Sequence, residues 1–313
     1  MGTFTGHIAP GLFFMSVGFW HLLNHIKLQV QQPNSYVSSP WFGTSKVRYI
    51  ELYSIFLGSI VSVSMELFLV HERHQPFDPD GTIPSNHLHN FEHSFISVTY
   101  SVYAAFAIIL DKIKPKARYA LTQSLQALGF GQQLFLFHFH SADHLGVEGQ
   151  YHMHLQIAIA VSLITALLGV NYPRSFIISF VRSTSILCQG LWFIVTGYML
   201  YTPSLLPKGC LIHMEEGLEK VRCKEEEALS RAKSLVNIQF SMCLIVVTII
   251  AMSLYLVLLK FCGENINYAA LSSKEMILEE ELDDVESANN DQTDDSKRFI
   301  HMGRNLGPIY IER

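Results

Sequence analysis

The sequence predicts an all-α fold, a polytopic integral membrane bundle of about seven transmembrane helices. Of the 313 residues, 49% are hydrophobic and only 16% are charged, whereas about a quarter of the residues of an ordinary soluble domain are charged. Apolar stretches also recur at lengths near the roughly 20 residues that a helix needs to cross about 30 Å of hydrocarbon. The lipid bilayer is therefore the expected partner of most of the chain.

Hydropathy in chain order gives seven candidate spans, and most prolines fall between them or in a first helical turn. Pro10 and Gly11 open the first span, where a missing N–H is harmless. No basic leading region or small-residue cleavage site precedes this span, so we expect it to remain in the protein. The spans are 8–26, 47–70, 91–110, 119–139, 153–170, 176–200 and 235–261.

The chain divides into a seven-helix transmembrane domain, 1–262, and an acidic tail, 263–313. Residues 263–296 carry eleven Asp and Glu but a single lysine, a composition typical of disorder. Without this tail the net charge of −5 nearly vanishes, so no nucleic-acid partner is expected. Tyr268 and Leu271 have the form of a tyrosine-based sorting signal, whose partners would be sorting adaptors.

Lysine and arginine in the short loops predict the orientation. The loop between spans three and four holds Lys112, Lys114, Lys116 and Arg118, and such loops face the cytoplasm. The amino terminus is then lumenal or extracellular, and the carboxyl terminus is cytoplasmic. Residues 202–233 do not fit this orientation, because they place six basic residues on the lumenal side. This loop is long and also carries six glutamates, so it counts little in the assignment.

The long loop between spans six and seven invites two expectations. Cys210 and Cys223 could pair as a disulfide in an oxidising compartment. The charged stretch 215–234, which contains Glu227 and Arg231 as an i,i+4 acid-before-base pair, predicts a solvated or interfacial helix that caps the bundle. Cys188 and Cys243 lie inside spans and are expected to be small buried residues.

Histidines gather at one membrane face under this topology. Eleven lie at the lumenal ends of spans one to five, together with Glu66, whereas only His21 and His25 lie at the other face. Ionisable groups at membrane depth are costly without a partner, so this layer is a candidate functional site. Taken singly, each histidine is more often an ordinary solvated or packed residue, and the spacing repeats no known metalloenzyme signature such as HExxH.

Imidazole with carboxylate suits zinc, iron, copper or nickel rather than calcium or magnesium. We expect zinc or iron as a cofactor, with some histidines outside the ligand set. The expected ligands are His93, His138, His140, His152, His154 and Glu66. The expected auxiliary groups are His7, His89, Glu92, Gln189 and Trp192.

Other polar residues in the spans have structural interpretations. Glu51 follows Arg48 by three positions, which predicts an ion pair at the membrane interface. Five glutamines are expected to bridge helices through their amides. They are Gln126, Gln132, Gln133, Gln156 and Gln189.

An ordered set of short motifs comprises Gly6-His7, Pro10-Gly11, Phe13-Phe14, Gly18, Glu92-His93-Ser94, Phe137-His138-Phe139-His140, His152-Met153-His154 and Gln189-Gly190-Leu191-Trp192-Phe193. This set resembles the transmembrane protein 45 family, whose plant branch is catalogued as viral-response proteins of unknown function. The resemblance covers most of the chain from Gly6 to Phe261. It implies a seven-helix protein of endomembranes without a settled activity.

Three function classes remain open on the sequence. The first is a membrane metalloenzyme, with Glu66 or Glu92 as a proton acceptor. The second is a carrier or sensor of metal ions or protons, for which histidine titration near pH 6.5 is suited. The third is a non-catalytic membrane scaffold. The expected location is an endomembrane, such as Golgi, endosome or vacuole, or the plasma membrane.

Overall fold

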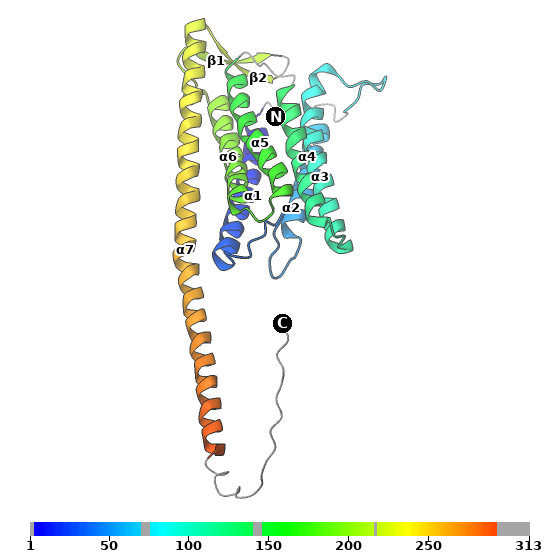
Figure 1. Cartoon of the computed structure of the whole chain (residues 1–313). Coiled ribbons are helices and arrows are strands. Elements are labelled where there is room, and N and C mark those ends of the chain that lie inside the picture. The colour runs from blue at the N-terminus through cyan, green and yellow to red at the C-terminus, as the bar shows by residue number, and fades with distance from the viewer. Residues whose placement is uncertain (1–2, 70–75, 140–145, 216–217, 293–313) are drawn as a thin grey trace, which may run out of the picture. The chain divides into compact units, whose positions relative to one another are not determined.

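The computed structural model of this protein describes residues 3–69, 76–139, 146–215 and 218–292. It is mostly helical, as expected, and Figure 1 shows helices α1 to α6 running alongside one another. The chain forms two compact units, Met1–Lys260 and Phe261–Arg313, and all the packing below belongs to the first.

The helices alternate with short connections and one hairpin. The α-helices are α1 (Phe4–Gln31), α2 (Ile50–Ser64), α3 (Leu88–Ile113), α4 (Arg118–His138), α5 (Val147–Asn171), α6 (Phe176–Tyr201) and α7 (Glu226–Gln292). A π-helical turn, η1 (Met65–Leu69), continues α2, and two short 3₁₀ turns are η2 (Ser85–His87) and η3 (Pro203–Leu205). The two strands are β1 (Cys210–Glu215) and β2 (Leu218–Cys223).

Five of the described helices are long and apolar enough to cross a membrane. They are Ile50–Leu69, Leu88–Ile113, Val147–Asn171, Phe176–Tyr201 and Glu226–Cys262. The other two expected spans coincide with α1, of 28 residues, and α4, of 21 residues. Both are long enough but more polar, because α1 carries three histidines and α4 carries four glutamines.

Glycines bring α1 and α6 into backbone contact. A Cβ added at Gly18 would lie 2.3 Å from the backbone nitrogen of Leu187, and one at Gly190 would lie 2.1 Å from that of Met15. No side chain fits at such distances, so only glycine allows this approach. Small residues at helix crossings are the usual means of close packing in membranes. They hold α1 against α6 along its length.

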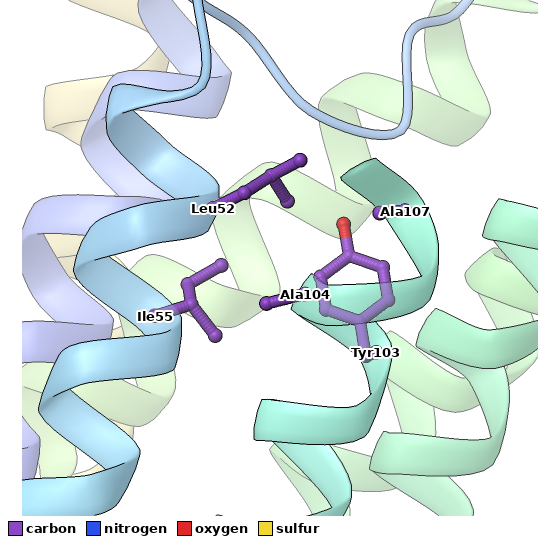
Figure 2. Close-up of a cluster of buried hydrophobic side chains, with 5 residues drawn as sticks. All are labelled: Leu52, Ile55, Tyr103, Ala104 and Ala107. Carbon is purple, nitrogen blue, oxygen red and sulfur yellow. The ribbon is translucent and has the colours of Figure 1, made fainter. Parts of the chain in front are cut away.

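The remaining helices pack in chain order, with α2 on α3, α3 on α4, α4 on α5 and α5 on α6. Leu52 and Ile55 of α2 meet Tyr103, Ala104 and Ala107 of α3 in a buried apolar cluster (Figure 2). The two alanines allow α3 to approach α2 closely. This cluster fixes the position of the continuous run of α2 and η1, which carries two acidic residues of the candidate site.

The loop before α7 departs from the all-α expectation. β1 and β2 pair antiparallel, with Cys210 opposite Cys223, and these two cysteines form the expected disulfide. Arg222 Nη2 lies 2.7 Å from Glu215 Oε2 across the hairpin. The expectation of a helix over residues 215–223 is therefore wrong, because a covalent link and a cross-strand ion pair favour the hairpin. The helix begins at Glu226 and includes Glu227 and Arg231.

The end of α7 lies in the second unit. The helix continues past the expected end of the last span as far as Gln292. The side chains of Tyr268 and Leu271 lie outside the described residues, so the sorting signal stays a prediction. The proposed disorder of the tail also stays a prediction.

Candidate functional site

A cavity of about 570 Å³ lies among α1, α2, α3 and α4, with α6 contributing to its wall. Most of its lining is aromatic or aliphatic. The aromatic lining residues are Phe13, Phe14, Tyr100, Tyr103, Phe130, Phe137 and Phe193. The cavity lies within the size range of small-molecule sites, about 300–1,000 Å³.

Two acidic side chains line the cavity, both from the continuous helical run of α2 and η1. Glu51 and Glu66 are fifteen positions apart in that run, which corresponds to about 22 Å at 1.5 Å per residue. They therefore lie toward opposite ends of the cavity. Each is paired with a histidine that also lines the cavity, His21 near Glu51 and His93 near Glu66.

At the Glu66 end, three side chains expected from the sequence come together. Nδ1 of His93 lies 3.7 Å from Oε1 of Glu66, and the side-chain amide of Asn90 donates to Oε2 over 2.7 Å. His89, one turn before His93, places its ring centroid 6.3 Å from that of His93. The carboxylate is thus oriented by Asn90 and lies near the imidazole of His93, whose ring in turn lies near that of His89. The turn that carries it is π-helical, a deviation that often marks functional positions.

The separation of Glu66 and His93 bears on metal binding. At 3.7 Å it exceeds the length of a hydrogen bond. Two ligands of one tetrahedral zinc lie about 3.4 Å apart when each metal–ligand bond is about 2.0–2.2 Å. The pair is therefore spaced as two ligands of a shared ion would be, and its donor atoms are of the types that zinc and iron accept.

A row of neighbouring rings continues from this pair into the bundle. His93 packs on Phe137, Phe137 packs on His152, and the His152 ring lies parallel to that of His7 with centroids 6.2 Å apart. His7 and His152 are buried. Five of the expected residues, Glu66, His89, His93, His152 and His7, thus share one end of the bundle.

The other predicted site residues in described segments point elsewhere. His138 is exposed and shares a hydrogen bond of 3.1 Å with Gln156, whereas His154 donates to the carbonyl oxygen of Gln150 and packs on Phe240 of α7. Since His152 and His154 alternate along a helix, they face different neighbours. Trp192 donates to the carbonyl oxygen of Tyr151.

Two further predicted residues remain, one a predicted ligand and one a predicted auxiliary group. His140 lies outside the described residues, and Glu92 is half-buried beside His93 in α3. Within the described ranges, no three His, Cys, Asp or Glu side chains converge closely enough to form a complete metal shell. Glu66 and His93 would therefore supply two ligands of the candidate site, and a complete metal shell would need further ligands.

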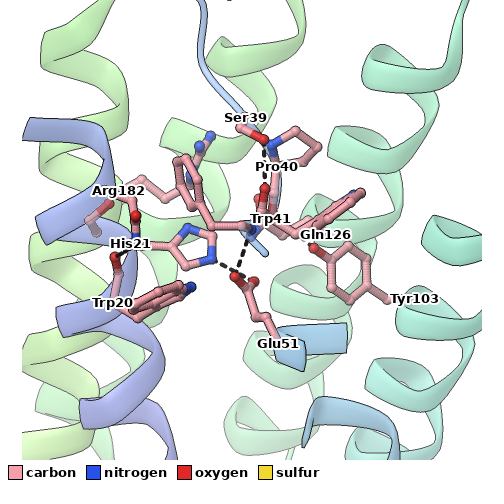
Figure 3. A network of polar contacts seen from close by, with 12 residues as sticks. Trp20, His21, Ser39, Pro40, Trp41, Glu51, Tyr103, Gln126 and Arg182 are labelled. Atoms are coloured by element: carbon pink, nitrogen blue, oxygen red, sulfur yellow. Dashed lines mark hydrogen bonds and ion pairs between the residues drawn. The ribbon is translucent and has the colours of Figure 1, made fainter. Parts of the chain in front are cut away.

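The other end of the cavity was not recognised as a site from the sequence. His21 Nε2 lies 2.7 Å from Glu51 Oε1, and the backbone N–H of Phe42 donates to Oε2 over 2.8 Å (Figure 3). The expected pair of Glu51 with Arg48 is wrong, because Arg48 Nη2 lies 2.8 Å from Asp111 of α3. The loop before α2 folds over the carboxylate and supplies the N–H, a long-range contact that spacing does not reveal.

Buried polar groups surround the His21 and Glu51 pair. Arg182 of α6 is fully buried and donates to Ser38 over 3.2 Å, and Figure 3 shows it beside His21. His25 shares a hydrogen bond of 2.8 Å with Tyr36. Burial raises the pKa of the Tyr36 phenol, so it stays protonated and able to donate. This end of the cavity is thus bounded by a polar network.

Four of the five expected glutamines bridge helices, whereas Gln126 accepts from Gln123 of its own helix α4. Gln189 donates to Ser162 of α5, Gln156 to the carbonyl oxygen of Phe137, and Gln132 to that of Phe95. Gln133 accepts from Tyr100 across the wall of the cavity. Gln189 therefore belongs to the α5–α6 contact rather than to the Glu66 end.

Part of the chain has a known family match. Residues 119–256 match the model of a family of unknown function (DUF716). The DUF716 segment includes α4, α5, α6 and the membrane-length part of α7. His152 and Phe137 lie within it, whereas both His–Glu pairs of the cavity lie before it.

Proposed function

We propose that this protein is a multi-pass membrane protein that binds a transition metal at the Glu66 end of its cavity. The observation that carries the proposal is the 3.7 Å separation of Glu66 and His93, with Asn90 orienting the carboxylate and His89 lying near His93. Hydrogen-bonded partners that orient a ligand are typical of metal sites. Zinc and iron are the metals best suited to this donor set.

The chemistry available to such a site is that of a membrane metalloenzyme. A bound metal would polarise a substrate bond or activate water. Glu66 and His93 would supply two of its ligands at one end of a cavity that is lined mainly by aromatic and aliphatic side chains. Histidines at the same end, His152 and His7, would support the ligands through the intervening Phe137 ring.

Metal analysis of the protein purified in mild detergent tests this proposal. We expect stoichiometric zinc or iron in the native protein and loss of most of it in Glu66→Ala and His93→Ala. His154→Ala is the matched control, because that imidazole packs on Phe240. If the native protein holds no stoichiometric metal, or if all three variants retain it equally, the proposal fails and the scaffold class takes its place.

A carrier of cations is the second candidate function. It is favoured by the His21 and Glu51 pair, which gives the cavity a second His–carboxylate group about 22 Å from the first. Proton or zinc flux into liposomes that contain the purified protein would identify a carrier. Glu51→Gln should then abolish the flux, while an enzyme would keep its metal and show no flux.

The membrane setting is part of the proposal. Seven spans, including α1 and α4, would place the amino terminus in the lumen and the carboxyl terminus in the cytoplasm. The motif resemblance to the plant branch of the transmembrane protein 45 family supports an endomembrane location. The Tyr268 and Leu271 pattern supports recognition by sorting adaptors on the cytoplasmic side.

A further inference from the structure

We propose that the cavity binds a neutral lipid with one long hydrocarbon chain and a terminal hydroxyl, which enters from the bilayer between α1 and α2. This inference deepens the proposed function, because the bound lipid would be the substrate of the Glu66 site. The binding of the lipid is nevertheless a separate property of the cavity walls. It can be tested without any metal.

The shape and lining of the cavity favour a long apolar chain. Glu51 and Glu66 mark a length of about 22 Å, and rings and aliphatic side chains form most of the wall between them. The polar groups in this wall largely satisfy one another. Ser97 donates to Ser62 over 3.0 Å, and Tyr100 donates to Gln133 over 2.9 Å. The middle of the cavity therefore offers a ligand mainly apolar contact.

The cavity also opens on the outer surface of the helices. Val61 and Met65 of the α2 and η1 run line it, yet they are 60% and 41% exposed. Ala9 of α1 lines it too and is exposed. Exposed residues from both helices border the same space, so the opening lies between α1 and α2. The surface there is apolar, as a lipid-facing entrance requires.

The ends of the cavity select the head group. When the Glu66 end holds no metal, a fatty-acid anion would meet the like charge of that carboxylate in a poorly solvated site. A hydroxyl can donate to a carboxylate or accept from an imidazole. The ends of the cavity should therefore favour a long-chain alcohol over the fatty acid of the same length, although the hydrocarbon chains of the two ligands would bury the same apolar area.

A binding experiment with tritiated 1-hexadecanol tests the inference on the full chain in mild detergent, with hexadecanoate as the matched ligand. We expect saturable binding of the alcohol and at least tenfold weaker binding of the acid. Ser59→Phe fills the cavity from α2 and should reduce alcohol binding at least tenfold. Leu57→Phe, which places the same side chain on the exposed face of the same helix, should leave it unchanged.

The outcomes separate the inference from the metal proposal. Metal content measured on the same samples, before and after chelation, reports on the Glu66 site alone. If the protein holds metal but does not bind the alcohol, this inference is wrong and the proposed function stands. If it binds the alcohol but holds no metal, the proposed function is wrong and this inference stands. Equal binding of acid and alcohol to the native protein would also overturn it, which keeps the test decisive if Ser59→Phe fails to fold.

Discussion

Nε2 of His21 in α1 lies 2.7 Å from Oε1 of Glu51 in α2, and both side chains are almost fully buried. The contact joins the two helices that border the lateral opening of the cavity. It lies at the end opposite to Glu66. The pair therefore holds the far end of the cavity closed while the near end carries the candidate metal ligands.

Removing one partner of this pair should be costly. We expect Glu51→Ala to destabilise the protein by about 3–5 kcal/mol, because it breaks a buried pair and leaves the N–H of Phe42 unsatisfied. Denaturant unfolding in detergent measures the change. Arg48→Ala is the control, since the Arg48 side chain is 64% exposed and its loss should change stability little. Equal effects of the two substitutions would argue against a structural role for the His21 pair.

Local spacing misassigned this pair for a physical reason. The i,i+3 relation of Arg48 and Glu51 assumes that both residues lie in one helix, but α2 begins at Ile50. Arg48 therefore lies in the preceding loop, where it reaches Asp111 and stacks near Trp41 and Tyr49. Helix lengths and the membrane-type pattern follow from local hydropathy, whereas this partner choice depends on how a distant loop folds.

The crossing of α1 and α6 should tolerate no side chain at Gly190. We expect Gly190→Ala to destabilise the protein by about 3 kcal/mol, because the new methyl group would meet the backbone of Met15. Gly131→Ala is the control, since its nearest neighbour would be Leu163 Cδ1 at 3.8 Å. The control should gain up to about 1 kcal/mol from helix propensity. Thermal unfolding followed by size-exclusion chromatography distinguishes the two variants.

The disulfide of the hairpin leads to one prediction about the stability of the protein and one about the side of the membrane on which the hairpin lies. Cys210 and Cys223 should resist a thiol-reactive polyethylene glycol until the protein is reduced. Their replacement by serine should cost about 3 kcal/mol, the value for closing a loop of similar length. Because disulfides persist in oxidising compartments, the hairpin should be protected from protease in sealed vesicles. Cleavage of the hairpin from the cytoplasmic side would invert the proposed topology.

The histidine layer was only partly resolved by sequence reasoning. Placing His7, His93 and His152 at one end follows from span order and hydropathy, and the structure brings them together through Phe137. The side that each imidazole faces within an HxH pair depends on helix rotation, which span order does not determine. His154 consequently turns toward α7. Asn90 was not predicted as a site residue, because it acts by a hydrogen bond to Glu66 and asparagine in a sequence does not by itself indicate a metal site.

Metal affinity at the Glu66 end should fall as the solution is acidified. Ligating histidines must be neutral, so protons compete with the metal for its imidazole ligands as the solution is acidified. We expect bound zinc to be retained at pH 7.5, to be released progressively between pH about 6.5 and 5, and to rebind on return to pH 7.5. Equilibrium dialysis with elemental analysis follows the release. Retention of the full metal content at pH 5 would exclude histidine ligation.

Asn90 should act as a positioning residue for the metal. Its side-chain amide donates to Glu66 Oε2 over 2.7 Å and leaves Oε1 facing His93. We expect Asn90→Ala to weaken zinc affinity about 10–100-fold, as the loss of groups that orient a ligand usually does. Unfolding of the chelated protein provides the second readout, because a purely structural role would alter stability without a selective loss of zinc. Unchanged zinc affinity in Asn90→Ala would show that Glu66 needs no orientation by Asn90, and would weaken its assignment as a ligand.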